Sequence, residues 1–229
     1  MHWNIGVGQL IDQTKIHDQC LSNDSKKRIQ ALEKLRYNFS LLLDKEQAWN
    51  DLHRLTSDKD SDVKKWAVHA LGSTFSQLPD KEQAWEDLHR LLNDEVWFMR
   101  FNAVRALGSV YSQVPDKEQA WEDLHRLLND NYWYVRKWAV RALGSIFSQL
   151  PDKEQAWNDL HRLLNDEDSD VRHWAGKAFG STFSQLPDKE LAWNELLRLT
   201  NDEDSDVRFN AVRALGSAFS QVPDKELVP

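Results

Sequence analysis

Apolar residues recur along the chain with the spacing of amphipathic helices, and this pattern is itself repeated. The segment DKEQAWNDLHRL begins at Asp44, and close copies begin at Asp80, Asp116, Asp152 and Asp188, so that each copy starts 36 residues after the last. Within a copy the apolar side chains fall at i, i+4, i+7 and i+8, which is the stripe that one face of a helix buries. A fixed period of this length indicates an array of stacked structural repeats.

Each repeat is predicted to contain two helices. In the repeat from Asp80, Pro79 precedes the N-cap Asp80 and Gln83 follows three residues later, as in a capping box. The second helix is expected to start within 94–98 and to end near Gln113. The first helix is expected to bury Ala84, Trp85, Leu88, Leu91 and Leu92. The second is expected to bury Met99, Ala103, Val104, Leu107, Tyr111 and Val114.

A glycine recurs inside every second helix. It occupies positions Gly72, Gly108, Gly144, Gly180 and Gly216. A glycine within a helix costs about 1 kcal/mol relative to alanine. We therefore expect neighbouring helices to approach closely at this position, which is a structural role.

The N-terminal segment fits the same frame in a degraded form, because Ile16 and His17 lie 36 residues before Leu52 and His53. These observations predict an all-α fold, an α-solenoid (superhelix) of six stacked antiparallel helix pairs. The expected division is a degenerate N-terminal capping pair at 1–43, five repeats at 44–79, 80–115, 116–151, 152–187 and 188–223, and a C-terminal remnant or tag-derived tail at 224–229.

The second helices share the pattern D-x-D-x-x-V-R-x-x-A-x-x-A-L-G. It occurs at 202–216, at 58–72 with Lys64 for arginine, and at 166–180 with Phe179 for leucine. This pattern resembles HEAT-like repeats of the phycobilisome-lyase type. The resemblance implies a solenoid whose second helices line a concave surface, and a binding scaffold rather than a particular chemistry. A natural tandem array and a consensus-type artificial repeat binder are both similar to this sequence, and the choice stays open.

Charge and cysteine content narrow the classes of function. The formal net charge of −8 disfavours a dedicated binder of nucleic acid or of an anionic membrane. Cys20 is the only cysteine, which excludes an internal disulfide and fits a reducing compartment. The sequence contains neither a signal-peptide pattern nor a run of roughly 18 apolar residues. We therefore expect a cytoplasmic protein with no membrane partner.

The repeats differ from one another mainly along one side of the second helix. The variable columns lie at i, i+3, i+4 and i+7, within roughly 60° of one line and opposite the alanine-rich core side. In a solenoid this side faces the concave surface, so the column aromatics should be largely exposed there: Trp66, Phe101, Trp138, Trp174 and Phe209. A further column is mostly cationic and contains His69, Arg105, Arg141, Lys177 and Arg213.

Aromatic residues replace the acidic helix start in two adjacent repeats. The segment NDNYWYVRKW at 129–138 carries Tyr132, Trp133 and Tyr134 where the next repeat carries Asp, Ser and Asp, and Trp97 and Phe98 stand at the same place one repeat earlier. An exposed aromatic patch usually marks an interaction site, and Trp, Tyr and Arg are frequent interface anchors. The sequence thus predicts a non-catalytic scaffold that binds a protein or peptide partner. The predicted partner-binding residues are Trp66, His69, Trp97, Phe98, Phe101, Arg105, Tyr132, Trp133, Tyr134, Trp138, Arg141, Trp174, Lys177, Phe209 and Arg213.

Two other functions use the same surface. In the first, the protein is an architectural homodimer in which the aromatic patch of one subunit packs against that of the other. Alternatively, the groove binds a planar small molecule or single-stranded nucleic acid, because cations beside aromatic rings resemble a stacking platform for bases. The net charge and the acidic residues at Asp62, Asp170 and Asp206 disfavour nucleic acid.

Neither catalysis nor metal binding is expected. The sequence has no H-E-x-x-H, G-x-S-x-G or glycine-rich phosphate motif, so no catalytic residue and no cofactor is predicted. Stacked helices lie roughly 10 Å apart, whereas metal ligands lie about 2 Å from their ion. The column His53, His89, His125 and His161 is therefore expected to consist of partly buried helix residues. The column Arg100, Arg136, Arg172 and Arg208 is expected to form a ladder between repeats, with the Asp six residues earlier as partner.

Overall fold

The computed structural model describes residues 11–219, and within them the chain forms twelve α-helices and five short 3-10 helices, with no strand. The chain divides into two compact units, one ending at Leu88 and the other beginning at His89. An all-helical solenoid of helix pairs, as the sequence predicts, is confirmed. The assigned repeat boundaries stay a prediction, and the tail at 224–229 lies outside the described residues.

The helices alternate between a shorter first helix and a longer second helix. Unit 1 contains α1 (Gln13–Cys20), α2 (Ser25–Asn38), α3 (Lys45–Leu55) and α4 (Ser61–Thr74). Unit 2 contains α6 (Trp97–Val110), α7 (Lys117–Leu127), α8 (Trp133–Ile146), α9 (Lys153–Leu163), α10 (Ser169–Thr182), α11 (Lys189–Leu199) and α12 (Ser205–Ala218). The division between the units falls inside α5 (Lys81–Leu92). Five second helices end in a 3-10 turn, at Phe39–Leu41, Phe75–Gln77, Tyr111–Gln113, Phe147–Gln149 and Phe183–Gln185.

The first helices begin where the capping pattern predicts. The Asp80 carboxylate accepts a hydrogen bond from the backbone N–H of Gln83 at 2.9 Å, and Asp116 accepts one from Gln119 at the same distance. Only this half of the capping box forms, because the Gln83 side chain donates instead to Glu86 at 2.8 Å. The aspartate alone therefore fixes the start of these helices.

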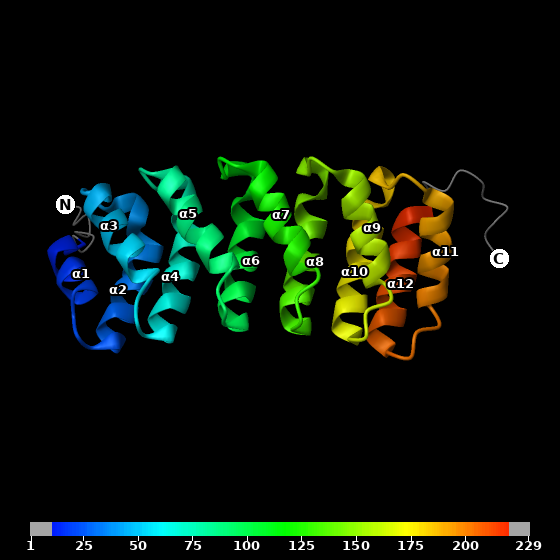
Figure 1. Cartoon of the computed structure of the whole chain (residues 1–229), viewed down its shortest axis with the longest axis horizontal. Helices are drawn as coiled ribbons and strands as arrows, with labels where there is room; N and C mark the ends of the chain where they lie inside the picture. Colours follow the sequence, from blue (N-terminus) through cyan, green and yellow to red (C-terminus); the bar gives the residue numbers. More distant parts are fainter. Residues whose placement is uncertain (1–10, 220–229) are drawn as a thin grey trace, which may run out of the picture. The chain divides into compact units, whose positions relative to one another are not determined.

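The second helices pack side by side in unit 2, in the order α6, α8, α10 and α12 (Figure 1). All the side chains predicted to face inward in α6 and in the 3-10 turn after it are buried, as are those predicted in α5. A Cβ atom built on Gly108, Gly144 or Gly180 would lie 3.1, 2.8 or 2.4 Å from the Cβ of Ala142, Ala178 or Ala214. The predicted close approach at the recurring glycine is thus confirmed at these three positions. It was wrong at Gly216, where a Cβ would meet no atom of residues 11–219 within 4 Å.

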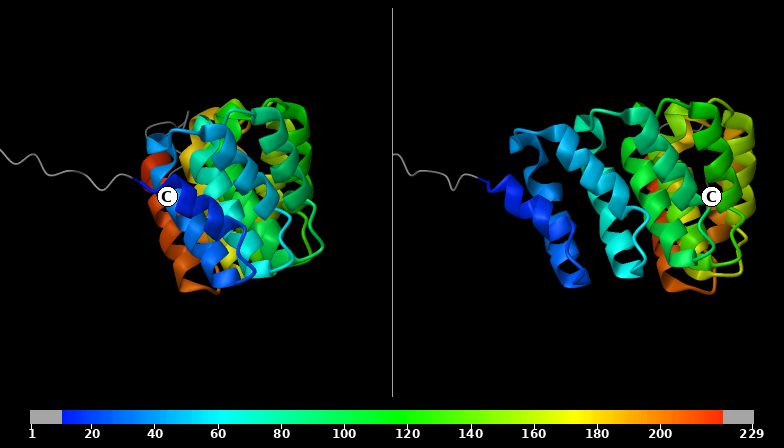
Figure 2. Two further views of the ribbon diagram at one scale, coloured as in Figure 1. Left: turned by 90° about the vertical axis from the view of Figure 1, so that its left-hand side faces the viewer. Right: turned by 60° about the vertical axis from the view of Figure 1, so that its left-hand side comes forward.

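Unit 1 repeats this packing on a smaller scale. Helices α2 and α4 lie side by side, and α1 packs on α2 and α3 (Figure 2). Cys20 is the last residue of α1, and its side chain is fully buried. Burial raises the pKa of this thiol to about 12, so that it stays protonated at neutral pH.

Arginines of the second helices link consecutive repeats. Arg136 donates from Nε and Nη2 to the two carboxylate oxygens of Asp166, each at 2.8 Å, and from Nη1 to the backbone oxygen of Asp130 at 2.9 Å. The same arrangement joins Arg100 to Asp130 and Arg172 to Asp202. The predicted ladder is therefore present, but the predicted partner was wrong. The Asp six residues earlier offers its carbonyl, and the carboxylate comes from the following repeat.

The histidine column of the first helices makes a second set of links. Nδ1 of His89 lies 2.6 Å from Oδ2 of Asp123, and Nδ1 of His125 lies 2.6 Å from Oδ2 of Asp159. The histidines are partly buried, as predicted, whereas these aspartates are almost fully buried. Sequence reasoning missed the aspartates, which occupy the position two residues before the histidine in every DLHRL segment.

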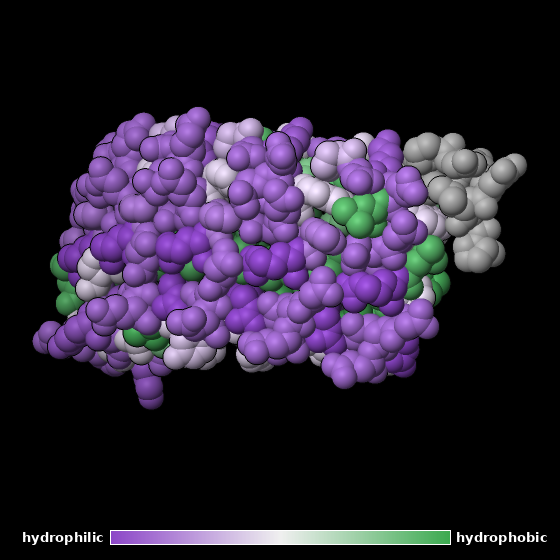
Figure 3. All heavy atoms as spheres, turned by 45° about the vertical axis from the view of Figure 1, so that its right-hand side comes forward, coloured by the Kyte–Doolittle hydropathy of each residue, from purple (hydrophilic) through white to green (hydrophobic). Residues whose placement is uncertain are grey.

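One face of the molecule is largely polar. Hydrophilic side chains predominate on the face drawn in Figure 3, where hydrophobic side chains appear in small separate groups. Across residues 11–219, no helix combines the length and the apolar character needed to cross a membrane.

Candidate partner-binding site

Helices α6 and α8 begin without a side-chain cap. Their N-cap residues are Val96 and Tyr132, and neither side chain accepts a hydrogen bond from the first turn. At the same place in α10, Asp168 accepts one from the backbone N–H of Asp170 at 3.0 Å. Losing a capping side chain costs typically about 1 kcal/mol. These two helix starts therefore lack a contribution to stability that α10 has, which points to a role other than helix capping.

The aromatic residues of these two helix starts form one cluster. We define the aromatic cluster as Trp97, Phe98, Phe101, Tyr132, Trp133 and Tyr134. The Trp97 ring lies 5.7 Å from that of Tyr132 and meets that of Tyr134 edge to face at 6.0 Å. Phe101 and Trp133 also contact Tyr134, with ring centroids 5.1 and 5.0 Å away. These are favourable aromatic geometries, so that the rings hold one another in place.

Four of these rings enclose a pocket. Trp97, Tyr132, Trp133 and Tyr134 line a cavity of about 200 Å³ that is open to solvent. The walls are made of ring surface, and 49% of Tyr132 and 40% of Trp133 remain exposed. A concave, apolar site of this kind suits one apolar or aromatic side chain of a partner.

A row of cations crosses the second helices beside the aromatic cluster. We define the cation row as Arg105 on α6, Arg141 on α8, Lys177 on α10 and Arg213 on α12. None of the four has an ion-pair partner within residues 11–219. Aromatic rings hold these side chains in position. The Arg141 guanidinium, for example, lies 4.0 Å from the ring centroids of both Trp138 and Trp174. Such cation–π contacts stabilise a charge without neutralising it.

The other members of the row also lie against rings. The Arg105 guanidinium is 5.4 Å from the Trp138 ring, and Nζ of Lys177 is 4.4 Å from the Trp174 ring. Arg213 lies 5.8 Å from the ring of Phe209. Burial, and then the like charge of Arg105, lower the pKa of Arg141 below its ordinary value.

The exposure predicted for the column aromatics was partly wrong. Phe101, Trp138 and Trp174 are only partly exposed, because their faces pack against the cation row and against neighbouring rings. Phe209 is 62% exposed, as expected. The remaining two predicted residues, Trp66 and His69, lie on α4 in unit 1, where their rings meet edge to face at 5.7 Å.

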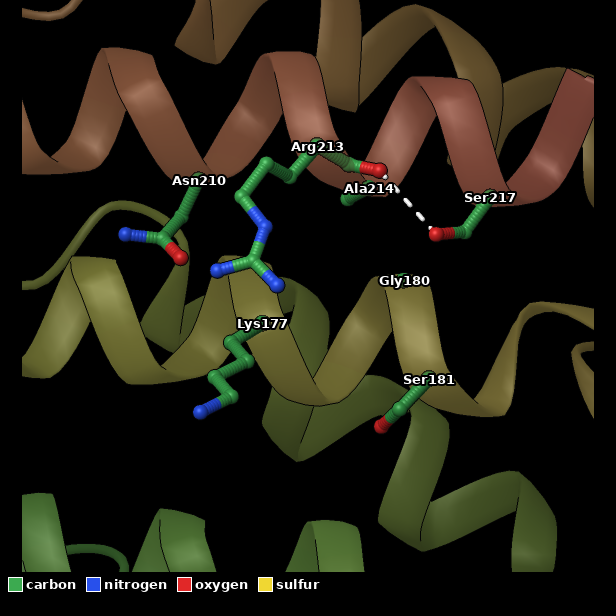
Figure 4. A pocket seen from close by; sticks show the side chains of 7 residues that line it. All are labelled: Lys177, Gly180, Ser181, Asn210, Arg213, Ala214 and Ser217. Carbon is green, nitrogen blue, oxygen red and sulfur yellow. Dashed lines mark hydrogen bonds between the residues drawn. The ribbon is translucent and has the colours of Figure 1, made fainter.

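Two shallow pockets separate the members of the cation row. Arg141, Lys177 and Gly144 line a pocket of about 190 Å³ between α8 and α10. One repeat further on, Lys177, Arg213 and Gly180 line a pocket of about 210 Å³ between α10 and α12 (Figure 4). Each pocket thus has a helical glycine in its wall and two cations beside it. Sequence reasoning placed these cations on the surface but did not predict the pockets.

The described residues offer no metal site. Nowhere in 11–219 do three or more His, Cys, Asp or Glu side chains converge in a way that could hold an ion. The groups that line the three pockets are aromatic rings, cations, hydroxyls, an amide and small residues. Such a set binds by stacking, charge and hydrogen bonding.

His173 on α10 is expected to make stability depend on pH. Burial lowers its pKa below the ordinary value of 6.5, and its Nδ1 lies 3.1 Å from the Asn210 amide, which donates to it only when that nitrogen is unprotonated. The folded state therefore binds the proton more weakly than the unfolded state, and stability falls as the pH drops below 6.5.

Two sister repeats carry phenylalanine at the position of His173, namely Phe101 and Phe209. The variant His173→Phe should therefore show a weaker dependence of stability on pH. We expect the unfolding free energy of the parent, measured by urea titration at pH 7.5 and pH 5.5, to fall more on acidification than that of His173→Phe. If the unfolding free energies of the two proteins fell equally, or if NMR gave a titration midpoint of His173 above 6.5, His173 would not be the source of the pH dependence.

Comparison with known proteins extends these findings. The sequence matches the family model of HEAT repeats over residues 52–144, 121–190 and 160–228. A search of curated proteins finds no match. Among solved structures, the chain is similar to a designed armadillo repeat protein in complex with the peptide (KR)4, with 26% identity, a TM-score of 0.63 and coverage of 92% of this chain and 99% of that chain.

Two further structures show the same architecture. Computationally designed armadillo repeat proteins for modular peptide recognition are 25% identical, with a TM-score of 0.57 and coverage of 89% of this chain and 98% of that chain. An engineered protein is 26% identical, with a TM-score of 0.60 and coverage of 90% and 96%.

Proposed function

We propose that this chain, which belongs to the HEAT-repeat family, is a non-catalytic scaffold that binds a peptide or an extended protein segment across the second helices of unit 2. The observation that carries the proposal is the start of α6 and α8. The N-cap residues there are Val96 and Tyr132, which offer no capping side chain, and aromatic residues follow them in the first turn. Aspartates cap α10 and α12 instead.

Helix caps and exposed rings have opposite effects on a free protein. The cap stabilises the helix, whereas solvent-exposed aromatic rings lower solubility. Both changes occur in the same two adjacent repeats and create the pocket between Trp97, Tyr132, Trp133 and Tyr134. Functional sites often combine a loss of stability with an exposed binding surface.

Two of the structural relatives support a peptide as the ligand. One holds the peptide (KR)4, and another belongs to proteins designed for modular peptide recognition. Their fold and length match this chain. In our proposal the aromatic cluster is the anchor site for an apolar side chain, and Arg105 and Arg141 add hydrogen bonds and steer association.

A triple variant tests the proposal by restoring the sister sequence. We select peptides from a display library on the parent chain and measure their affinity for Tyr132→Asp with Trp133→Ser and Tyr134→Asp. Affinity should fall by about tenfold or more, because truncating an interface anchor costs about 2 kcal/mol. The restored cap should offset part of the ring packing lost, so that the variant stays folded.

A matched control changes an exposed apolar residue elsewhere. Leu191 on α11 is 36% exposed and stands where four other repeats carry glutamine. Leu191→Gln should leave peptide affinity unchanged. Peptides that bind the triple variant as tightly as the parent would refute the site.

Self-association makes a different prediction for the same proteins. Light scattering over a wide concentration range should give a constant monomer mass for both the parent and the triple variant. A parent dimer that dissociates in the triple variant would assign the aromatic cluster to self-assembly instead.

A further inference from the structure

The cation row differs from the arginines that link consecutive repeats. Arg100, Arg136 and Arg172 each contact a carboxylate at 2.9 Å or less. The four cations of the row have no such contact within residues 11–219, although the whole chain carries a net charge of −8. An excess of acid elsewhere and a line of free cations here indicate a surface reserved for an anionic partner.

The rings beside the row already have partners. Trp138 contacts both Arg105 and Arg141, and Trp174 contacts both Arg141 and Lys177. Base stacking requires free ring faces. The arrangement therefore disfavours single-stranded nucleic acid and favours a ligand that binds the cations themselves.

The pockets along the row supply space for small anionic groups. In Figure 4 the Arg213 side chain extends from α12 toward α10, across the pocket that Gly180 and Ser181 line. The Ser181 hydroxyl already donates to Ala178 O at 2.9 Å, and that of Ser145 donates to Ala142 O at 2.7 Å. The cations are thus the principal donors left for an anion at these pockets.

The proximity of like charges makes an anion favourable at this place. Burial and the charge of Arg105 both lower the pKa of Arg141. A carboxylate placed between two members of the row would relieve this repulsion and form charge-assisted hydrogen bonds.

The spacing of the row defines the ligand further. Packed helices lie about 8–10 Å apart, so the backbone positions that carry successive cations recur at about that distance. A polyproline II segment has three residues per turn and rises about 3.1 Å per residue, which places every third side chain on one side at about 9 Å intervals. An extended β-strand, with a repeat of two residues, matches this distance less well.

We propose that the cation row binds an acidic peptide in an extended, polyproline II-like conformation, with Glu or Asp at every third residue. This inference rests on the proposed function and names the chemistry of its ligand. Each carboxylate lies in the groove between two second helices, between consecutive cations of the row.

The first test uses three labelled twelve-residue peptides and fluorescence anisotropy at low salt. They are (Glu-Pro-Ala)4, its neutral analogue (Gln-Pro-Ala)4, and an isomer in which the four glutamates are contiguous. The periodic acidic peptide should bind about tenfold tighter than the neutral one and about threefold tighter than the isomer, and the affinity should decrease as salt is added. Equal affinity of the acidic and neutral peptides would overturn the inference.

The second test removes two exposed members of the row. The double variant Lys177→Gln with Arg213→Gln should bind (Glu-Pro-Ala)4 about tenfold more weakly than the parent does. Its affinity for (Gln-Pro-Ala)4 should be unchanged. The matched control, Lys45→Gln with Lys153→Gln, makes the same change of charge at exposed starts of first helices and should have little effect. Equal losses in the two variants would mean that only the net charge matters, and the row would be rejected as a site.

Two outcomes separate this inference from its alternatives. If a twelve-nucleotide oligothymidylate binds more tightly than the acidic peptide and loses affinity in Lys177→Gln with Arg213→Gln, the row is a nucleic-acid site and the inference fails. If display-selected peptides depend on the aromatic cluster but the acidic probe shows no preference over the neutral one, only the acidic specificity fails and the proposed function stands.

Discussion

Replacing Arg136 by glutamine is expected to lower the free energy of unfolding by about 3–5 kcal/mol, because the change leaves a buried carboxylate without its cation. The Arg136 and Asp166 side chains are only 7% and 6% exposed, and two hydrogen bonds of 2.8 Å join them. Urea denaturation of the full chain, followed by circular dichroism, measures the loss.

Arg208 supplies the matched control for this change. It occupies the same column on α12, where it donates to the carbonyl oxygens of Asp202 and Glu203 at 2.7 and 2.8 Å and has no carboxylate partner within residues 11–219. Arg208→Gln should cost only about 1 kcal/mol, as expected for hydrogen bonds to a partly exposed group. A similar loss in the two variants would show that the carboxylate pair contributes little to the link between repeats.

Gly180→Ala and Gly216→Ala are expected to change stability in opposite directions. At Gly180 the new Cβ would lie 2.4 Å from the Cβ and 2.9 Å from the Cα of Ala214, so the two helices must move apart, at a cost of about 1–3 kcal/mol. At Gly216 a Cβ would meet no atom of residues 11–219 within 4 Å, so only the gain in helix propensity of about 1 kcal/mol remains.

The pair of variants isolates packing from backbone propensity, because both remove a glycine at the same position of a second helix. The propensity gain at Gly180 is the same as at Gly216, so the difference between the two unfolding free energies, about 1–3 kcal/mol, measures the helix contact. Two equally stabilised proteins would show that the helices adjust freely and that the recurring glycine has no packing role.

Much of this architecture follows from the sequence because repeats average out local ambiguity. A helix signal at Asp80 is seen again at Asp116 and Asp152, so that the two helices of a repeat were predicted correctly. The close approach was predicted correctly at Gly108, Gly144 and Gly180, but not at Gly216. The grouping of Trp97 with Tyr134 also followed, since equivalent positions in adjacent repeats lie side by side in a solenoid.

The pairing of side chains between repeats was less predictable. A column of arginines and a column of aspartates do not reveal whether partners belong to the same repeat or to successive ones, and Arg136 pairs with Asp166 of the following repeat. The burial of Trp138 and Trp174 depends on how the Arg141 side chain folds between them, which helix periodicity does not describe. The pockets along the cation row depend on the same side-chain geometry.

The arginine ladder has a consequence for how such a gene changes length. Asp130 accepts from Arg100 of the preceding repeat through its carboxylate and from Arg136 of its own repeat through its carbonyl. Asp166 and Asp202 do the same in the next two repeats. These repeats of unit 2 therefore each carry one donor half and one acceptor half of the same junction. Unequal recombination that adds or removes one whole 36-residue period regenerates both junctions without any further mutation. The array is thus able to lengthen or shorten by whole repeats, each adding one more second helix to the row.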